Sequence, residues 1–316
     1  MPTVNTVTGP VDVTALGFTL MHEHVYVLTE GLNAEFPHLW DRDARMKQAV
    51  ADLSEAKAHG VSTMVDLTVL GLGRDVAFVR EAAQKSDMQI IAATGLYTFD
   101  ELPHYFASRS IDQMADIFVR DIEVGIQGTD VKAAILKVAT DEQGVTTGVE
   151  KVLRAVARAH RRTGVPISTH THAASQQGLN QQRILTEEGV DLRRVVIGHS
   201  GDSEDMTYLE KLIAAGSYVG MDRFGLHQFL PTERRVATIA KLVERGHTGH
   251  IVLSHDAMCY IDWYPEEMRA ALPDYNYLHI SDVAVPALRA AGVSEEHIHT
   301  MTTDNPSRFF ATEGAY

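Results

Sequence analysis

Histidines, one lysine and one aspartate are the residues of this sequence with the clearest chemical potential. The chain has 16 histidines but a single cysteine, Cys259, so intramolecular disulfides and cysteine-rich metal sites are excluded. Seven of the notable residues follow or end short apolar runs: His22, His24, Lys137, His170, His172, His199 and Asp256. Imidazole and carboxylate groups are common ligands of catalytic divalent metals. These residues predict a metal centre if the fold brings them together.

The spacing of His22 and His24 is informative but not decisive. Side chains two positions apart share one side of an extended segment, so both rings can face one site. Such a pair alone is more often two surface or core histidines than a pair of ligands. The additional residues His170, His199 and Asp256 are what make a catalytic metal centre the favoured interpretation.

Lys137 interrupts a run, 133–138, that is predicted to be buried on both faces. An unpaired ammonium there is costly. One interpretation is a lysine at the end of a strand that reaches solvent or pairs with Asp141 or Glu142. The other is a desolvated lysine whose neutral amine takes up carbon dioxide and becomes an anionic carbamate that bridges two metals. The local sequence leaves both open.

The elements that must position these residues alternate along the chain. Eight β-branched or apolar runs are predicted strands, at 17–21, 61–67, 89–94, 132–138, 166–171, 194–198, 217–222 and 250–254. Segments with helical spacing lie between them, for example Met46, Ala49, Val50, Leu53 and Val236, Ile239, Ala240, Val243. Several helices are expected to end at a glycine that can adopt the left-handed conformation: Gly60, Gly164, Gly189, Gly216, Gly246 and Gly292.

Alternating strands and helices imply a parallel sheet, because parallel neighbours need a long crossover. Eight such units without an intervening linker favour one α/β domain over residues 1–316, a (β/α)8 TIM barrel. A doubly wound open sheet is the alternative, but the sequence contains no glycine-rich phosphate loop. In a barrel the carboxyl ends of the strands converge on one face, so we expect the metal site there.

Composition excludes several classes of partner. The chain has 28 Lys plus Arg against 42 Asp plus Glu, a formal charge of −14, and no basic block, so no nucleic-acid partner is expected. No apolar run approaches the roughly 20 residues that cross a bilayer, and the amino terminus lacks the pattern of a signal peptide. We therefore expect no membrane association and a cytoplasmic location.

Short motifs around the candidate residues resemble the phosphotriesterase family of the amidohydrolase superfamily. They are MHEH at 21–24, THTH at 169–172, GHSGD at 198–202, SHD at 254–256 and DNPSRF at 304–309, together with Lys137. Within that family the chain looks most like the phosphotriesterase-like lactonases, because Gly95-Leu96-Tyr97 and the segment 220–225 follow their pattern. The resemblance covers essentially the whole chain.

The resemblance implies a binuclear centre with defined ligands. His22, His24 and Asp256 would hold the more buried divalent ion, and His170 and His199 the more exposed one. Carboxylated Lys137 and a hydroxide would bridge the two ions. Zinc is the expected metal, with cobalt, manganese or iron as alternatives. His172 matches the motif but no ligand of the family, and is expected to contact a ligand or face the pocket.

Arg223 departs from the pattern of the true phosphotriesterases. Those enzymes carry a histidine there, in a proton relay from the metal-bound aspartate to a carboxylate that matches Asp202. The departure favours a lactonase over a specialised organophosphate hydrolase. Arg223 is expected either to organise Asp202, Asp256 or the nearby backbone, or to form a structural salt bridge at the barrel rim.

The resemblance also implies a reaction, in which the hydroxide attacks a lactone carbonyl. Asp256 would move the proton to the leaving alkoxide, while Tyr97 assists at the oxyanion and Arg223 supports the site.

The expected substrates are N-acyl homoserine lactones, as in quorum quenching, and other aliphatic lactones, with weak phosphotriesterase activity. The expected substrate contacts are Tyr97, Leu72, Arg223, Leu226, Phe229, Cys259 and Trp263. These loop residues line an acyl channel or, in the plainer interpretation, pack the loops or a subunit contact; a homodimer is expected from the family.

Three other functions fit parts of the sequence. The enzyme could act mainly on organophosphate triesters or carboxylic esters. It could be a deaminase of the same superfamily with one metal and an unmodified Lys137. Finally, the chain could be a noncatalytic metal-binding protein, although the intact set of site residues argues against this.

Overall fold

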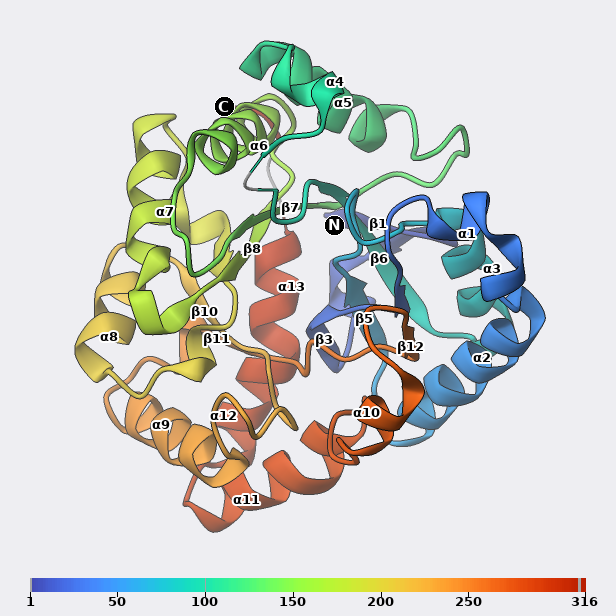
Figure 1. The fold of residues 1–316 in the computed structure, drawn as a ribbon. Helices are drawn as coiled ribbons and strands as arrows, with labels where there is room; N and C mark the ends of the chain where they lie inside the picture. The colour runs from blue at the N-terminus through green and yellow to red at the C-terminus, as the bar shows by residue number, and fades with distance from the viewer. Residues whose placement is uncertain (1, 100, 312–313) are drawn as a thin grey trace.

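Eight parallel strands form the centre of the computed structural model, which describes residues 2–99, 101–311 and 314–316. They are β3 (Thr19–Glu23), β5 (Thr63–Asp66), β6 (Gln89–Gly95), β7 (Ile135–Thr140), β8 (Ile167–Thr171), β9 (Val195–Ile197), β10 (Tyr218–Met221) and β11 (Ile251–Leu253). Each strand pairs with the next, and β11 returns to contact β3, so the sheet curls into a nearly closed barrel (Figure 1). All eight predicted strands and the TIM-barrel fold are confirmed.

Helices connect the strands and surround the barrel, as Figure 1 shows. The α-helices are α1 (Leu32–Glu35), α2 (Arg42–Ala58), α3 (Val76–Ser86), α4 (His104–Ala107), α5 (Ile111–Glu123), α6 (Thr147–Thr163), α7 (Gln177–Glu187), α8 (Met206–Ala214), α9 (Thr232–Glu244), α10 (Glu266–Ala270), α11 (Val285–Ala290), α12 (Glu295–His299) and α13 (Asn305–Phe310). A π-helical segment, Ile280–Ala284, leads into α11. No helix in the described part of the chain is long and apolar enough to cross a membrane.

The predicted helices form because one face of each can be buried. In α2, Met46, Ala49 and Leu53 are buried against the barrel, and the Asp41 side chain caps the first turn by accepting a hydrogen bond from the Ala44 amide. All six glycines predicted at helix ends have positive φ. At Gly164, φ is 76° and its amide closes α6 on the His160 carbonyl, as a left-handed helix end requires.

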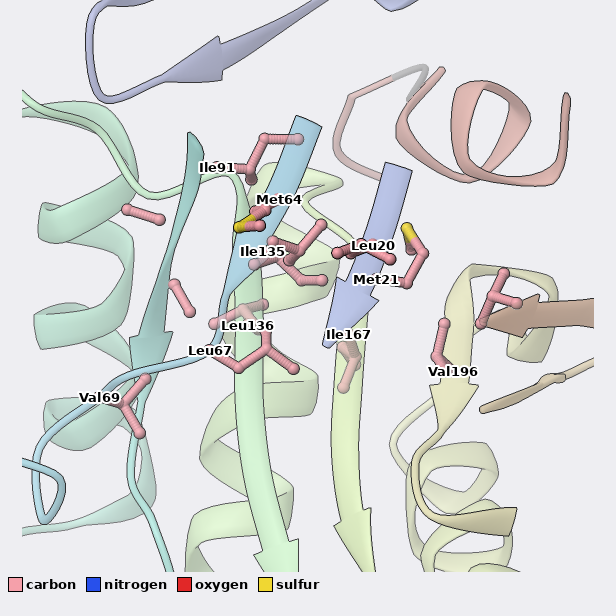
Figure 2. Close-up of a cluster of buried hydrophobic side chains, with 14 of the residues drawn as sticks. Leu20, Met21, Met64, Leu67, Val69, Ile91, Ile135, Leu136, Ile167 and Val196 are labelled. Atoms are coloured by element: carbon pink, nitrogen blue, oxygen red, sulfur yellow. The ribbon is translucent and has the colours of Figure 1, made fainter. Parts of the chain in front are cut away.

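The apolar core is continuous from the strands to the helices. Leu20, Met64, Ile135 and Ile167 come from four different strands, and each is at most 2 % exposed. Figure 2 shows these side chains within one buried cluster. Close packing of this kind fixes the strand ends and therefore the residues that follow them.

Two small sheets supplement the barrel and were not predicted. β1 (Thr3–Thr6) and β2 (Gly9–Asp12) form an antiparallel hairpin. β4 (Tyr26–Val27) pairs in parallel with β12 (Tyr260–Ile261). The second pairing joins the segment after β3 to the segment after β11, and so ties together two loops on the side of the barrel where the candidate site lies.

Candidate metal centre

The predicted ligands meet at the carboxyl ends of the strands. Lys137 and His170 lie in β7 and β8, and His22 lies in β3. His24, His199 and Asp256 follow β3, β9 and β11. Gly95 permits the close approach of β6 to this cluster, because a side chain at that position would meet the Lys137 carbonyl oxygen at 1.9 Å. Residues separated by more than 200 positions therefore share one buried site.

The inward-facing atoms of these side chains lie close together. His22 Nε2 is 2.8 Å from Lys137 Nζ and 3.5 Å from Asp256 Oδ1. His24 Nε2 is 3.3 Å from the same aspartate oxygen. His170 Nδ1 is 3.0 Å from His199 Nε2. Ligand atoms of His22, His199 and Asp256 all lie within 4.8 Å of one another, close enough to share a metal ion.

Asp222 orients two of these histidines. Its Oδ2 lies 2.9 Å from His22 Nδ1, and its Oδ1 lies 2.9 Å from His199 Nδ1. A carboxylate accepts hydrogen bonds, so both Nδ1 atoms carry the hydrogen and both Nε2 lone pairs face the site. Sequence reasoning assigned no role to Asp222. The available signal was an acidic residue directly after the apolar β10, the same position relative to a strand that identified the ligands.

The other two histidines are fixed in the same manner. His24 Nδ1 lies 2.9 Å from Thr68 Oγ1, and His170 Nε2 lies 3.5 Å from Asp141 Oδ2. Each of the four imidazoles therefore has one nitrogen held from outside and one directed inward. Metal-binding histidines characteristically have such outer partners. With one carboxylate added, this donor set fits divalent metal ions.

Burial favours the uncharged form of His22, His170 and His199, and of the Lys137 amine. It lowers the pKa of His22 to about 4, with Lys137 acting in the same direction. Burial also lowers the pKa values of His170 and His199. Lys137 is 1 % exposed, and burial lowers the pKa of its amine to about 7. Among the described residues, Asp141 and Glu142 form no ion pair with Lys137, so the solvent-facing interpretation of this lysine is wrong.

Two site residues have a left-handed backbone that side chains disfavour. His199 has φ 56° and Asp256 has φ 60°. Such conformations cost roughly 1–3 kcal/mol each and persist where the surroundings enforce them. The His199 amide donates to Asp222 Oδ1 at 2.7 Å, and the Asp256 amide donates to the His22 carbonyl at 3.0 Å. Both turns are thus held by bonds to other residues of the site.

Arg223 joins the metal centre to the rim. Its Nε donates to Asp256 Oδ2 at 3.1 Å, and its Nη1 donates to Asp202 Oδ2 at 3.0 Å. Asp202 also accepts from Arg235 Nη2 at 2.6 Å, and Arg235 is fully buried. The arginine therefore occupies the position between two carboxylates that the sequence motif indicated, and both expected roles, organiser and salt bridge, describe the same contacts.

A cavity of about 320 Å³ opens above these residues. Six of the predicted substrate contacts line it, namely Leu72, Tyr97, Arg223, Leu226, Phe229 and Trp263. The Tyr97 ring lies edge-on to His170, with centroids 5.4 Å apart. Further residues also line the cavity: Val27, Gln228, Met258, Ile261, Tyr264, Met268, Leu272 and Tyr275. The cavity is thus largely apolar above a polar base.

Two candidate residues lie elsewhere. Cys259 is 2 % exposed, does not belong to the cavity lining, and its Sγ lies 3.3 Å from Tyr277 Oη. The neighbouring Met258 lines the cavity instead. The expectation that Cys259 faces the substrate is corrected accordingly. His172 bonds Ser175 Oγ through Nδ1 at 2.7 Å and also lies outside the lining.

Comparisons with known proteins agree with this geometry. The model of the phosphotriesterase family matches residues 2–310. A phosphotriesterase homology protein of Mycobacterium tuberculosis is 54% identical over 100% of both chains. An aryldialkylphosphatase of Saccharolobus solfataricus is 44% identical over 94% of this chain and 95% of its own. The solved structure of the phosphotriesterase from Mycobacterium tuberculosis has a TM-score of 0.97 and covers 100% of each chain at 54% identity.

Proposed function

The chain belongs to the phosphotriesterase family of metal-dependent hydrolases, and from this premise we propose that it is a binuclear lactonase. The proposed substrates are aliphatic lactones, including N-acyl homoserine lactones, with weaker phosphotriesterase activity. The observation that carries the proposal is the position of Arg223 between Asp256 and Asp202. Membership of the phosphotriesterase family in particular argues against the deaminase and the noncatalytic alternatives.

The ligand geometry supports two metal positions. His22, His24 and Asp256 would hold one ion, and His170 and His199 the other, with Lys137 carboxylated between them. Two ions bound there would bring the pKa of a bound water toward neutrality and polarise the scissile carbonyl. The buried amine of Lys137 supports carboxylation, because only an uncharged amine has the lone pair that attacks carbon dioxide.

Arg223 decides where the proton of the attacking water goes. Burial alone would lower the pKa of its guanidinium, but Asp256 and Asp202 raise it above the usual range. Arg223 therefore cannot accept a proton from Asp256. The water oxygen bonds to the carbonyl carbon, Asp256 takes the proton, and the ring carbon–oxygen bond then breaks. Asp256 returns the proton to the leaving alkoxide, so the products balance as one ring-opened hydroxy acid.

Return of the proton from Asp256 to the leaving group favours hydrolysis of lactones over that of activated phosphotriesters. An alkoxide leaving group must be protonated, whereas the phenolate released from paraoxon leaves without a proton. With a phenolate product, Asp256 would have to lose its proton to solvent, and Arg223 blocks the direct route to Asp202. The geometry therefore supports a preference for substrates whose leaving group takes the proton back.

Tyr97 supplies a hydrogen-bond donor beside the base of the cavity. Burial raises the pKa of its phenol above the usual range, so the hydroxyl stays protonated. We infer that it donates to the carbonyl oxygen as negative charge develops there, a contribution that increases in the transition state. The apolar lining above it, including Leu226, Phe229 and Trp263, would hold an acyl chain.

The test is a substrate panel combined with metal analysis. The purified protein should bind two metals per chain and hydrolyse homoserine lactones of graded acyl length, or γ- and δ-lactones, with a higher kcat/KM than paraoxon. The variant Arg223→His should raise the paraoxon-to-lactone ratio, and Arg223→Lys, which keeps the charge, should not. A kcat/KM for paraoxon above that for every lactone would overturn the proposal, as would fewer than two metals without lactone turnover.

A second candidate is a main activity on organophosphate triesters. The names of the relatives, phosphotriesterase homology protein and aryldialkylphosphatase, favour it. The same substrate panel separates the two candidates, because they predict opposite rankings of paraoxon and lactones. A homodimer and a cytoplasmic location stay predictions of the sequence, as does zinc.

A further inference from the structure

The barrel has one seam that differs from the others. Among the described residues, ladders of strand pairing join each neighbour from β3 through β11, but no ladder pairs β11 with β3. Beyond the end of β11 the two segments exchange backbone bonds, from the Asp256 amide to the His22 carbonyl at 3.0 Å and from the His24 amide to the Ala257 carbonyl at 2.9 Å. His22 and His24 stand on one side of this seam, and Asp256 stands on the other.

Glu23 lies between the two histidines and crosses the seam. It is 1 % exposed, and its Oε1 accepts from Ser254 Oγ at 2.7 Å and from the His255 amide at 2.9 Å. The same oxygen lies 2.7 Å from His255 Nδ1, and Oε2 accepts from the Ala257 amide at 2.8 Å. One buried carboxylate thus binds four donors, all from the segment that carries Asp256.

The partners of Glu23 are themselves fixed. His255 Nε2 accepts a hydrogen bond from the Ile280 amide at 2.9 Å, so its Nδ1 carries the hydrogen that Glu23 accepts. Ser254 Oγ accepts from the His22 amide at 2.8 Å while it donates to Glu23. The network therefore connects β3, the turn at Asp256 and the π-helical segment before α11. Every group in it has a partner, as a buried polar network requires.

The hydrogen bonds to Glu23 flank Asp256, which has a disfavoured backbone conformation. Asp256 has φ 60°, and the residues immediately before and after it both donate their amides to Glu23. Asp222 holds the left-handed His199 in a comparable way, through the amide and the ring. Both disfavoured turns of the site are thus anchored to a buried carboxylate.

We propose that Glu23 is a positioning residue that holds Asp256 against His22 and His24 across the seam between β11 and β3. Its carboxylate replaces the missing ladder at the point where the proposed ligands of one metal come from two chain segments. The inference rests on the proposed ligand assignment, but not on the identity of the substrate. A glutamine at this position keeps the size of the side chain but presents a donor group to donors.

The experiment compares Glu23→Gln with Asp121→Asn in the full-length protein. Asp121 is a matched control, because it is also a buried carboxylate with two side-chain donors, Thr94 at 2.7 Å and Arg74 at 2.9 Å, that lie outside the proposed ligand set. Cobalt titration followed by visible absorbance should show that Glu23→Gln binds one of two ions roughly 10- to 100-fold more weakly. Its kcat for the best substrate should fall while KM stays within about twofold.

A second readout needs neither metal nor substrate. Hydrogen exchange of the metal-free protein should accelerate at the amides of His255 and Ala257 in Glu23→Gln and stay unchanged there in Asp121→Asn. Unchanged exchange and unchanged cobalt affinity in Glu23→Gln would overturn the proposal, and so would an equal loss in Asp121→Asn. If the parent protein binds no metal, the proposed function fails, while the exchange measurement still decides the role of Glu23.

Ser254→Ala keeps the experiment decisive if Glu23→Gln does not fold. This variant removes one of the four donors to Glu23 and leaves the carboxylate in place. A smaller weakening of the same ion, together with faster exchange at His255, is expected. Parent-like affinity and exchange in folded Ser254→Ala would overturn the proposal.

Discussion

The base of the cavity and its wall are built by different means. The base consists of residues that lie in strands or within three residues after them: His22, His24, Lys137, His170, His199 and Asp256. The wall consists of the cavity-lining residues after β10 and β11: Leu226, Gln228, Phe229, Met258, Ile261, Trp263, Tyr264, Met268, Leu272 and Tyr275. In the base, each imidazole is held by a partner outside the site. In the wall, Phe229 is 52% exposed, Trp263 47% and Met268 58%.

This difference separates two tasks. Side chains of the base that are held by hydrogen-bond partners can stabilise a transition state, because their orientation needs no adjustment during the reaction. Apolar loop side chains with free surface can adapt to substrates of different shape. The base should therefore determine the rate for all substrates, and the wall should determine which substrate is preferred.

Hydrogen bonds connect the segment after β11 to the base. The hydroxyl of the wall residue Tyr275 donates to the Asp256 carbonyl, and the hydroxyl of Tyr277, which lies outside the cavity lining, donates to the His24 carbonyl. The two wall loops also meet each other: Gly225 has φ 90°, and a side chain there would meet the Asp274 carbonyl oxygen at 2.1 Å. His227 Nε2 lies 2.9 Å from Asp274 Oδ2 beside this contact.

The largest effect is expected at the base. Asp256→Asn should lower kcat for lactones and paraoxon alike by roughly 10²- to 10⁴-fold, because the variant cannot accept the proton and loses a charged ligand. Steady-state kinetics on both substrate classes, with metal content by elemental analysis, measures this. Asp121→Asn should retain parent activity. A loss confined to one substrate class would contradict the division between base and wall.

The next effect concerns Lys137 in the metal-free protein. Its pKa of about 7, lowered by burial from the usual 10.5, leaves the ammonium dominant below pH 7 and the neutral amine dominant above it. At a fixed concentration of dissolved carbon dioxide, reconstitution with metal should therefore accelerate about tenfold from pH 6 to pH 8, as the neutral fraction of the amine rises. Recovery of activity over time gives the rate. A rate that ignores bicarbonate at pH 8 would argue against carboxylation.

A smaller and selective effect is expected at the wall. Phe229 lines the cavity, and its ring lies 4.6 Å from the Arg223 guanidinium. Phe229→Ala should lower kcat/KM for long-chain lactones about tenfold while short lactones change little, since removed apolar contact is worth about 1–3 kcal/mol. Phe36 is the matched control at 50% exposure outside the cavity lining. Equal losses of kcat/KM for all chain lengths would contradict a role of Phe229 in substrate preference.

The smallest effect is expected where the two wall loops meet. His227 and Asp274 are 43% and 51% exposed, so their ion pair contributes little to stability. His227→Gln should change the long-to-short lactone ratio by less than about threefold and leave the melting temperature unchanged within about 1 °C. His59→Gln, which breaks a similarly exposed pair with Asp282, should change neither quantity. A larger shift in the ratio would show that this pair sets the width of the cavity.

The sequence by itself determined the barrel and most residues of the base. Strand and helix periodicity is local, and glycines at helix ends mark the repeat, so the eight strands could be predicted. Polar residues at strand ends then indicated the site, because a parallel barrel places those ends on one face. Lys137 was identified by its type alone, as a lysine within an apolar strand.

Only the tertiary structure decided how these residues are held. Asp222 joins His22 to His199, which are 177 positions apart, and Glu23 joins the chain segments on the two sides of Asp256. It also decided that Met258 rather than Cys259 faces the cavity. Such contacts depend on how strands and loops that are distant in the sequence pack in the closed barrel, and local periodicity does not predict them. The sequence specified which groups could do the chemistry; packing across the barrel fixed their orientations.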